Sequence, residues 1–345
     1  MYRKILIIRT DRIGDVLLTT PVIKALRDNL PQAYIAMMVD PSASEIIKDN
    51  PYLDEVIIYD KKGLHKGFWE NFKFILNLRR KRFDLALVLH TKNRMNLICW
   101  LSGVRERVGY YNENFGFLLT KRLADTRSEG LKHEVDYCLD VLKAIGIESE
   151  EKELFIPVDS ESKKWVEDIL RENHVSNADR LVAIHPGASC ISKRWFPERF
   201  AKLADNLIEK YNVKILVVSG KEGISYSQEM ISKMINRVLD FSGKTPLKQL
   251  TALLSKCCLF ISNDSGPCHI AVAVNVPVIS IFGRNQRGLS PVRWRPLGEK
   301  SIVVHKEVGC KDCLAHNCQK KFACLQAITV NDILRYVDII LGLKK

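Results

Sequence analysis

The stretch Phe260–Gly283, FISNDSGPCHIAVAVNVPVISIFG, contains a complete strand, turn, helix and strand pattern. An apolar run ends at Asn263-Asp264, a short polar turn follows, and Pro267 has a fixed φ angle that suits the first position of a helix. A second apolar run, Pro277–Gly283, comes after the expected helix Pro267–Val274. Two apolar strands joined through a helix predict a βαβ unit with parallel strands.

The same alternation continues along the chain in both directions from this stretch. In the second half we expect strands at 181–187, 214–220, 258–264 and 277–283, with helices at 160–174, 200–211, 247–255 and 267–274. In the first half we expect strands at 4–8, 33–40, 55–60 and 83–90, with helices at 16–30 (kinked at Pro21), 42–48 and 68–80. The fold class is therefore α/β, with two doubly wound parallel sheets covered by helices on both faces.

The length of 345 residues suits two domains of about 150 residues each. The extended, polar segment Leu154–Ser162 marks the boundary, so we expect domains at 1–158 and 159–328 and a terminal helix within 329–345. Ligands in such folds bind at the carboxyl ends of the strands, and the cleft between two facing domains is the expected site.

The net charge of +13 leaves two interpretations open: an ordinary Lys-rich surface, or an anionic partner such as nucleic acid, a membrane or a phosphorylated substrate. No apolar run approaches the roughly 18–20 residues that span a bilayer, and the N-terminus lacks a signal-peptide pattern, so we expect a cytoplasmic protein. Ten cysteines in such a protein favour thiols or metal ligands over a disulfide framework.

The turn Asn263–Gly266 predicts an anion site. The backbone N–H groups of Ser265 and Gly266 would point out of the helix N-terminus, and the helix dipole favours negative charge there. His269, one turn further on, is placed to reach the same anion. The alternative is a plain helix cap in which Asp264 accepts the amides.

A second turn, in HPGASCISKRWFPERF (His185–Phe200), also follows a strand and contains Ser189, Lys193 and Arg194. Lys193 is a candidate to neutralise a phosphate, although most such charges are simply solvated. Both turns end strands of one expected sheet, which favours a common phosphate site. Because the sequence lacks P-loop, G-x-G-x-x-G, G-x-S-x-G and D-x-D motifs, we expect amides, Lys and His rather than a metal to hold the anion.

The turn in RTDRIGDVLLTTP (Arg9–Pro21) has an acid, Asp15, where similar folds receive an anion. A carboxylate repels phosphate, so Asp15 is either a helix cap or a general base. The helix N-terminus lowers the pKa of Asp15 slightly, whereas burial under a bound ligand would raise it by more; we expect a raised pKa in the working complex.

The three motifs ILIIRTDRIGDVLLTTP, HPGASCISKRWFPERF and SNDSGPCHIAVAVNVPVISIFG, in this order, resemble glycosyltransferase family 9, the ADP-heptose:lipopolysaccharide heptosyltransferases. The resemblance implies a GT-B fold of two facing Rossmann-like domains, the first binding the acceptor and the second the nucleotide sugar. It also implies an inverting, metal-independent transfer of heptose from ADP-heptose to a lipopolysaccharide core acceptor. The terminal helix would cross back to the first domain, as is frequent in that fold.

The resemblance also implies roles for individual residues. Asp15 would be the general base, and Glu222 would reach the ribose. The nucleotide diphosphate would be held by Ser189, Lys193, Asp264, Ser265, Gly266 and His269. The chain departs from the family pattern at Cys268, where many relatives have Met, and at the additional Phe196 before Pro197. These departures leave the donor less certain, so a GT-B transferase that uses another nucleotide sugar for a different surface glycan stays an alternative.

The positive charge fits a phosphorylated, lipid-linked glycan acceptor, with the protein peripheral on the cytoplasmic face of the inner membrane. Lys61, Lys62 and Lys66 are the candidate acceptor-binding residues, and basic clusters at 79–82 and 121–122 lie in the same expected domain. The alternative from another class is a basic nucleic-acid- or nucleotide-binding protein without catalysis. We expect no nucleic acid, because the charges do not alternate with aromatic residues.

The tail sequence CKDCLAHNCQKKFAC contains Cys310, Cys313, Cys318 and Cys324, with His316 between them. The C-x2-C pair followed by two further cysteines is typical of structural zinc sites, although the spacing matches no standard zinc ribbon. A structural zinc site and a set of reduced thiols therefore both stay open, and no cofactor is expected for catalysis.

Overall fold

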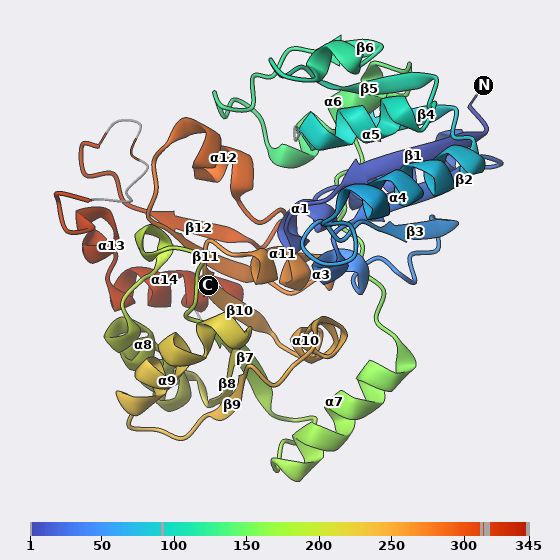
Figure 1. The fold of residues 1–345 in the computed structure, drawn as a ribbon. Coiled ribbons are helices and arrows are strands. Elements are labelled where there is room, and N and C mark those ends of the chain that lie inside the picture. Colours follow the sequence, from blue (N-terminus) through green and yellow to red (C-terminus); the bar gives the residue numbers. More distant parts are fainter. Residues whose placement is uncertain (1, 91–92, 311–312, 314–317, 343–345) are drawn as a thin grey trace. The chain divides into compact units, whose positions relative to one another are not determined.

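The computed structural model describes residues 2–90, 93–310, 313 and 318–342 (Figure 1). The chain divides into two compact units, unit 1 (Met1–Pro157) and unit 2 (Val158–Lys345). The division falls in residues 154–159, which form neither helix nor strand.

In the described part of unit 1, six parallel strands form one sheet in the order β3-β2-β1-β4-β5-β6. The strands are β1 (Lys4–Arg9), β2 (Tyr34–Val39), β3 (Glu55–Ile58), β4 (Leu85–Val88), β5 (Glu106–Tyr110) and β6 (Lys121–Leu123). The helices are α1 (Ile13–Leu17), α2 (Thr20–Asn29), α3 (Pro41–Ser44), α4 (Phe68–Lys81), α5 (Asn93–Leu101), η1 (Gly116–Leu118) and α6 (Glu134–Lys143).

In unit 2, six described parallel strands form a second sheet in the order β12-β11-β10-β7-β8-β9. The strands are β7 (Arg180–His185), β8 (Val213–Ser219), β9 (Leu239–Ser242), β10 (Leu259–Asn263), β11 (Val278–Phe282) and β12 (Ile302–His305). The helices are α7 (Ser160–Glu172), η2 (Ile191–Lys193), α8 (Pro197–Tyr211), η3 (Lys221–Gly223), α9 (Ile224–Ser232), α10 (Leu247–Leu254), α11 (Gly266–Ala273), η4 (Arg287–Leu289), α12 (Pro291–Trp294), α13 (Ala323–Ala327) and α14 (Val330–Ile340).

Numbered within its own unit, each sheet has the strand order 3-2-1-4-5-6 of the doubly wound fold. The prediction of two such sheets is confirmed. In both sheets the order reverses between the first and fourth strands, which are β1 and β4 in unit 1 and β7 and β10 in unit 2. A crevice at the carboxyl ends of these two strands is where this fold binds ligands.

The central strands are apolar because helices cover both faces of each sheet. Ile5, Leu6, Ile7 and Ile8 of β1 are fully buried, and so is the whole of β10. Burying each side chain of this size contributes about 1.5–3 kcal/mol. At the end of β11, a Cβ on Gly283 would lie 2.5 Å from the backbone carbonyl oxygen of Ser192, so the loop after β7 packs directly on this glycine.

The helix expected at 16–30 is in fact two helices. Pro21, which has no backbone N–H, lies in the first turn of α2, where no intrahelical donor is needed. It therefore begins a helix and does not kink one. The Thr20 hydroxyl donates to the carbonyl of Leu17 at 2.7 Å and closes the end of α1. The short α1 therefore holds Asp15 in a segment separate from the longer α2.

The terminal helix α14 belongs to unit 2. Its buried residues Ile333, Leu334 and Val337 are part of the same core cluster as α8 and the central strands of that unit. The Tyr211 hydroxyl of α8 also donates to the Asp338 carboxylate at 2.6 Å. The apolar side of this helix therefore covers the second sheet. That the helix also reaches the first domain stays a prediction.

Candidate active site

The candidate base Asp15 lies just beyond the carboxyl end of β1, at the strand-order reversal of unit 1. It is the third residue of α1, and its carboxylate accepts the backbone N–H of Arg12 at 3.3 Å. Its other oxygen accepts the Arg9 guanidinium at 3.0 Å. His90, after β4, is 3.4 Å from the Thr10 hydroxyl, so the ends of both central strands contribute polar groups here.

Arg9 is the centre of a buried charge network. Its side chain is only 3% exposed, and it contacts three carboxylates: Asp15 at 3.0 Å, Glu134 at 2.8 Å and Asp11 at 3.1 Å. Glu134 is fully buried and begins α6, where the helix dipole favours a negative charge. One guanidinium therefore orients the candidate base while it holds together α1 and α6.

The environment of Asp15 raises the pKa of its carboxyl group. Burial is the largest cause, the positive charge of Arg9 opposes it, and the carboxylates of Asp11 and Glu134 raise the pKa further. The expected direction is thus present without a ligand, because the protein itself buries Asp15. A carboxylate whose pKa is raised toward the working pH is a better general base than an ordinary one.

The three candidate acceptor-binding lysines share one loop, between β3 and α4, but differ in position. Lys61 donates to the carbonyl of Thr10 at 3.2 Å, so it lies beside the end of β1 and the Asp15 segment. Lys62 and Lys66 are exposed further along the loop. The Asp60 carboxylate orders this loop by accepting the backbone N–H groups of residues 62, 63 and 64. The structure therefore brings only Lys61 of the three to the end of β1.

In unit 2, Asn263 forms side-chain hydrogen bonds that link the turn after β10 to the loop after β7, the two segments that the sequence predicts to share a site. Its fully buried side chain donates to the carbonyl of Pro186 at 2.8 Å and accepts the backbone N–H of Trp195 at 2.9 Å. The turn after β10 is thereby fixed to both ends of the loop after β7. Arg194 also stabilises that loop. Its guanidinium donates to the carbonyl of Ala188 at 3.0 Å and stacks over the ring of Tyr226.

Lys193 and Asp264 meet at this edge of the sheet. The ammonium of Lys193 is 2.5 Å from the Asp264 carboxylate, and both side chains are nearly buried. Ser265 is at the N-cap position of α11, which begins at Gly266; its hydroxyl accepts no amide of the helix and lies 2.8 Å from the hydroxyl of Ser262. His269 is buried in the same helix, one turn further on.

The remaining two candidates lie on neighbouring segments. Ser189 is exposed in the loop after β7, and Glu222 is exposed in η3, directly after β8. Strands β10, β7 and β8 are adjacent and parallel, so their carboxyl ends lie on the same side of the sheet. All the predicted nucleotide-binding residues come after one of these three ends.

Sequence analysis did not select Arg9, Glu134 or Asn263. Arg9 had a signal, since it follows four buried apolar residues at the end of β1, and a buried charge there must be paired. Glu134 lies 125 residues further along the chain, so only the fold brings it to Arg9.

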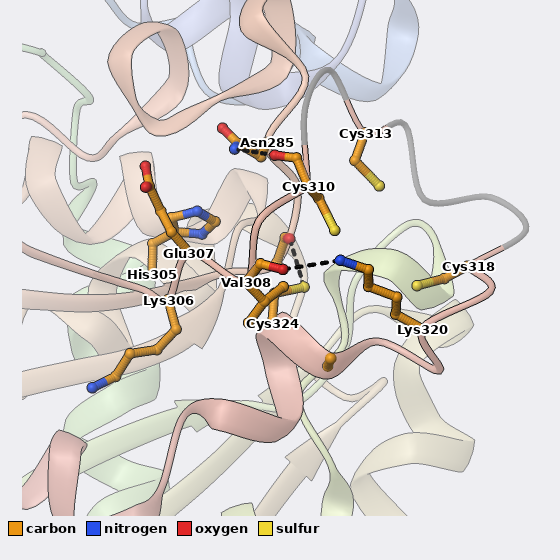
Figure 2. Close-up of a pocket in the computed structure, with 12 residues that line it drawn as sticks. Asn285, His305, Lys306, Glu307, Val308, Cys310, Cys313, Cys318, Lys320 and Cys324 are labelled. Atoms are coloured by element: carbon orange, nitrogen blue, oxygen red, sulfur yellow. Dashed lines mark hydrogen bonds between the residues drawn. The ribbon is translucent and has the colours of Figure 1, made fainter.

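The four tail cysteines line one hollow at the end of β12, together with Asn285 and Lys320, as Figure 2 shows. The Cys324 thiol donates to the carbonyl of Gly283 at 2.9 Å, and the Cys318 sulfur accepts the N–H of Phe322 at 3.2 Å. Burial raises the pKa of the Cys324 thiol, and the neighbouring Cys318 and Cys310 add to this effect. Among the described residues, no three His, Cys, Asp or Glu side chains are placed to hold a metal ion. His316 lies outside the described residues.

The sequence model of glycosyltransferase family 9 (heptosyltransferase) matches residues 71–323, which is most of the chain. The chain belongs to this family. As a member of glycosyltransferase family 9, it is a glycosyltransferase. Lipopolysaccharide heptosyltransferase 3 of Escherichia coli K12 is 28% identical over 328 residues, which cover 93% of each chain. Lipopolysaccharide core heptosyltransferase OpsX of Haemophilus influenzae is 26% identical over 93% of this chain and 87% of its own.

Solved structures of family 9 proteins have the same fold. A family 9 glycosyltransferase of Veillonella parvula superposes with a TM-score of 0.89, at 24% identity over 99% of this chain and 98% of its own. The ADP-heptose lipopolysaccharide heptosyltransferase II of E. coli superposes with a TM-score of 0.80, at 22% identity over 99% of both chains. The GT-B fold implied by the sequence motifs is thus confirmed. Within the described residues, every helix is too short or too polar to cross a bilayer.

Proposed function

We propose that this family 9 glycosyltransferase transfers heptose from ADP-heptose to a lipopolysaccharide core acceptor, with inversion and without a metal in the catalytic step. Asp15 carries the proposal, because it is a largely buried carboxylate with a raised pKa, oriented by Arg9 at a strand end where this fold class binds ligands. The relatives named above favour this activity over transfer from another nucleotide sugar, and family membership favours it over nucleic-acid binding.

In the proposed reaction, Asp15 accepts the proton of an acceptor hydroxyl as its oxygen bonds to the anomeric carbon of heptose. The bond from that carbon to the diphosphate oxygen breaks on the opposite side, and its electron pair leaves with ADP. Lys193, the Ser265 hydroxyl and the first amides of α11 would stabilise the departing diphosphate, with His269 and Ser189 beside them. Asp264 orients Lys193, and Glu222 would hold the ribose.

The acceptor in this proposal is a phosphorylated, lipid-linked glycan at the cytoplasmic face of the inner membrane, to which the protein binds peripherally. Lys61 is the best placed of the three lysines to bind acceptor phosphate or carboxylate, because it lies beside the end of β1. Lys62 and Lys66 would add longer-range attraction from the same loop.

The donor is tested by measuring which nucleotide sugars raise the melting temperature of the protein. We expect ADP-heptose and ADP to do so and the corresponding UDP-sugars not to. Lys193→Ala should weaken ADP binding about 10- to 150-fold, because a charge-assisted contact contributes about 1.5–3 kcal/mol. Lys202→Ala, an exposed lysine of α8, is the control and should bind ADP like the wild type. Protection by a different nucleotide sugar alone would show that the donor is wrong, and protection by none would contradict the transferase proposal.

We also propose that the four tail cysteines hold a structural zinc ion. A set of four thiolates suits zinc, but it requires all four sulfur atoms to converge on one point. Metal analysis of the purified protein should give about one zinc per chain if they do, and replacing Cys310 with Ser should abolish it. Protein without zinc that reacts fully with a thiol reagent would instead establish reduced thiols.

A further inference from the structure

Helix α4 has two apolar sides, and one of them is exposed. Phe74, Ile75 and Leu78 pack against the core of unit 1. On another side, Phe68, Trp69, Phe72 and Leu76 are exposed, and Leu64 of the preceding loop adds to them. We call these five residues the aromatic face. Phe68 and Trp69, two of its three aromatic members, are 77% and 67% exposed.

The aromatic face is one continuous surface. Residues 68, 72 and 76 are spaced four apart and so lie in a row along the helix. Trp69 contacts the rings of both Phe68 and Phe72, with ring centroids 5.6 and 6.3 Å apart. Single exposed apolar residues are ordinary in proteins, but a contiguous group of this kind marks a binding surface.

A basic hollow adjoins the aromatic face. It measures about 600 Å³, and Leu76 of the aromatic face is part of its wall. Four arginines line it, namely Arg79, Arg80, Arg82 and Arg105. We call it the arginine hollow. The one acid in its wall, Asp84, accepts the backbone N–H groups of Arg3 and Lys4 at 2.9 Å, and a single carboxylate cannot balance the charge of four arginines. Trp100 and Leu101, just before Ser102 and Gly103 of the wall, are exposed as well.

We propose that the aromatic face and the arginine hollow together dock the protein on an anionic lipid bilayer. Tryptophan and phenylalanine insert at the boundary between lipid headgroups and acyl chains, and arginines beside them bind the phosphates. Stable peripheral binding needs two such signals, apolar insertion and basic attraction, and this surface supplies both. A second copy of the chain fits less well, because pairing two such surfaces would bring their arginines together.

This inference rests on the proposed function for its biological purpose. It names the surface by which the protein would reach a lipid-linked acceptor. The loop that begins at Lys61, beside the end of β1, leads directly through Leu64 to the aromatic face. The Leu64 and Phe68 end of the aromatic face therefore lies toward the strand end that carries Asp15. The arginine hollow lies at the other end of α4, beside the amino ends of the strands, where Asp84 contacts Arg3 and Lys4. A bilayer along α4 would touch both ends, and the acceptor would reach Asp15 past the Leu64 end.

The test is flotation of the full chain with vesicles of phosphatidylcholine alone or mixed with phosphatidylglycerol. The wild type should bind the mixed vesicles, less so as salt increases, and bind neutral vesicles weakly. The triple variant Phe68→Ser, Trp69→Ser, Phe72→Ser should lose at least about tenfold in partitioning, because the inserting side chains are gone. The double variant Arg79→Glu, Arg80→Glu should lose both binding and its salt dependence.

A matched control replaces exposed apolar residues elsewhere, Ile235→Ser and Ile339→Ser in unit 2, and should bind like the wild type. The proposal is overturned if the triple variant floats like the wild type, if the wild type ignores the phosphatidylglycerol, or if the variants only convert an oligomer to a monomer. Transfer to a water-soluble, delipidated acceptor should be unchanged in the triple variant. If the wild type fails that transfer but still floats as expected, the proposed function fails while the docking surface stands.

Discussion

Replacing Asp15 with Asn should lower kcat by about 10²–10⁴-fold, because a positioned general base contributes about that factor to proton transfer. Asparagine keeps the size and the hydrogen bond acceptor of the side chain but cannot take the proton from the acceptor hydroxyl. The rate should be measured with saturating ADP-heptose, so that donor binding does not contribute to the loss.

The pH dependence of wild-type kcat/KM tests the same role of Asp15. The base works when ionised, so kcat/KM should fall as the pH decreases through the raised pKa of Asp15. The fall should therefore begin above the ordinary aspartate pKa of about 3.9. In Asp15→Asn this acidic limb should be absent from whatever activity remains.

Folding of the Asp15→Asn variant should be intact. Because the folded-state pKa of Asp15 is raised, the folded protein loses stability as the pH increases through that pKa and the carboxyl group ionises in a buried position. A neutral Asn removes this cost, so at neutral pH the variant should melt at or above the wild-type temperature. Asp11→Asn is the matched control, since Asp11 contacts the same Arg9. Full activity in Asp15→Asn with a large loss in Asp11→Asn would refute the assignment.

Replacing Arg9 with Met should destabilise the protein by about 3–5 kcal/mol at neutral pH, because three carboxylates lose the buried charge that compensates them. The loss should be smaller at acidic pH, where Asp15, whose pKa is raised, becomes protonated. Urea unfolding at the two pH values measures both effects. Lys24→Met removes an exposed ion pair with Asp28 and should unfold like the wild type.

Arg9→Met also tests how Arg9 serves Asp15. Arg9 lowers the pKa of Asp15 against the effect of burial, so its removal should move the acidic limb of kcat/KM to higher pH. Arg9→Lys keeps the charge and should restore the limb toward its wild-type position, although one ammonium cannot reach all three carboxylates. An unshifted limb in Arg9→Met would mean that Arg9 has only a structural role.

The central strands could be predicted from the sequence because they are buried on both sides and contain continuous apolar runs, residues 5–8 in β1 and 259–261 in β10. Strands β5 and β6 could not. Their sequences, ERVGY and KRL, are short and charged. Strand β6 lies at the edge of the sheet and needs little apolar surface, and β5 is its neighbour. The break between α1 and α2 was missed because the apolar spacing continues through it.

The candidate site residues could be selected because each follows an apolar run that ends in a polar turn. Their partners could not, since the contacts of Asp15 with Arg9 and of Arg9 with Glu134 depend on the packing of α6. The aromatic face could not be predicted from the sequence for another reason. The spacing of apolar residues in α4 predicts a helix but does not tell which of two apolar sides meets the sheet.

The ion pair of Lys193 with Asp264 has a consequence for the end of the catalytic cycle. In the proposed role, a diphosphate binds Lys193 in competition with a carboxylate only 2.5 Å away. In that role the carboxylate would compete with the donor and with ADP alike for Lys193, and it would pair with the lysine again as ADP leaves. Product release limits the rate of many enzymes, and affinity is set mostly by the rate of dissociation. The proposed site would therefore release ADP sooner than a site with an unpaired lysine.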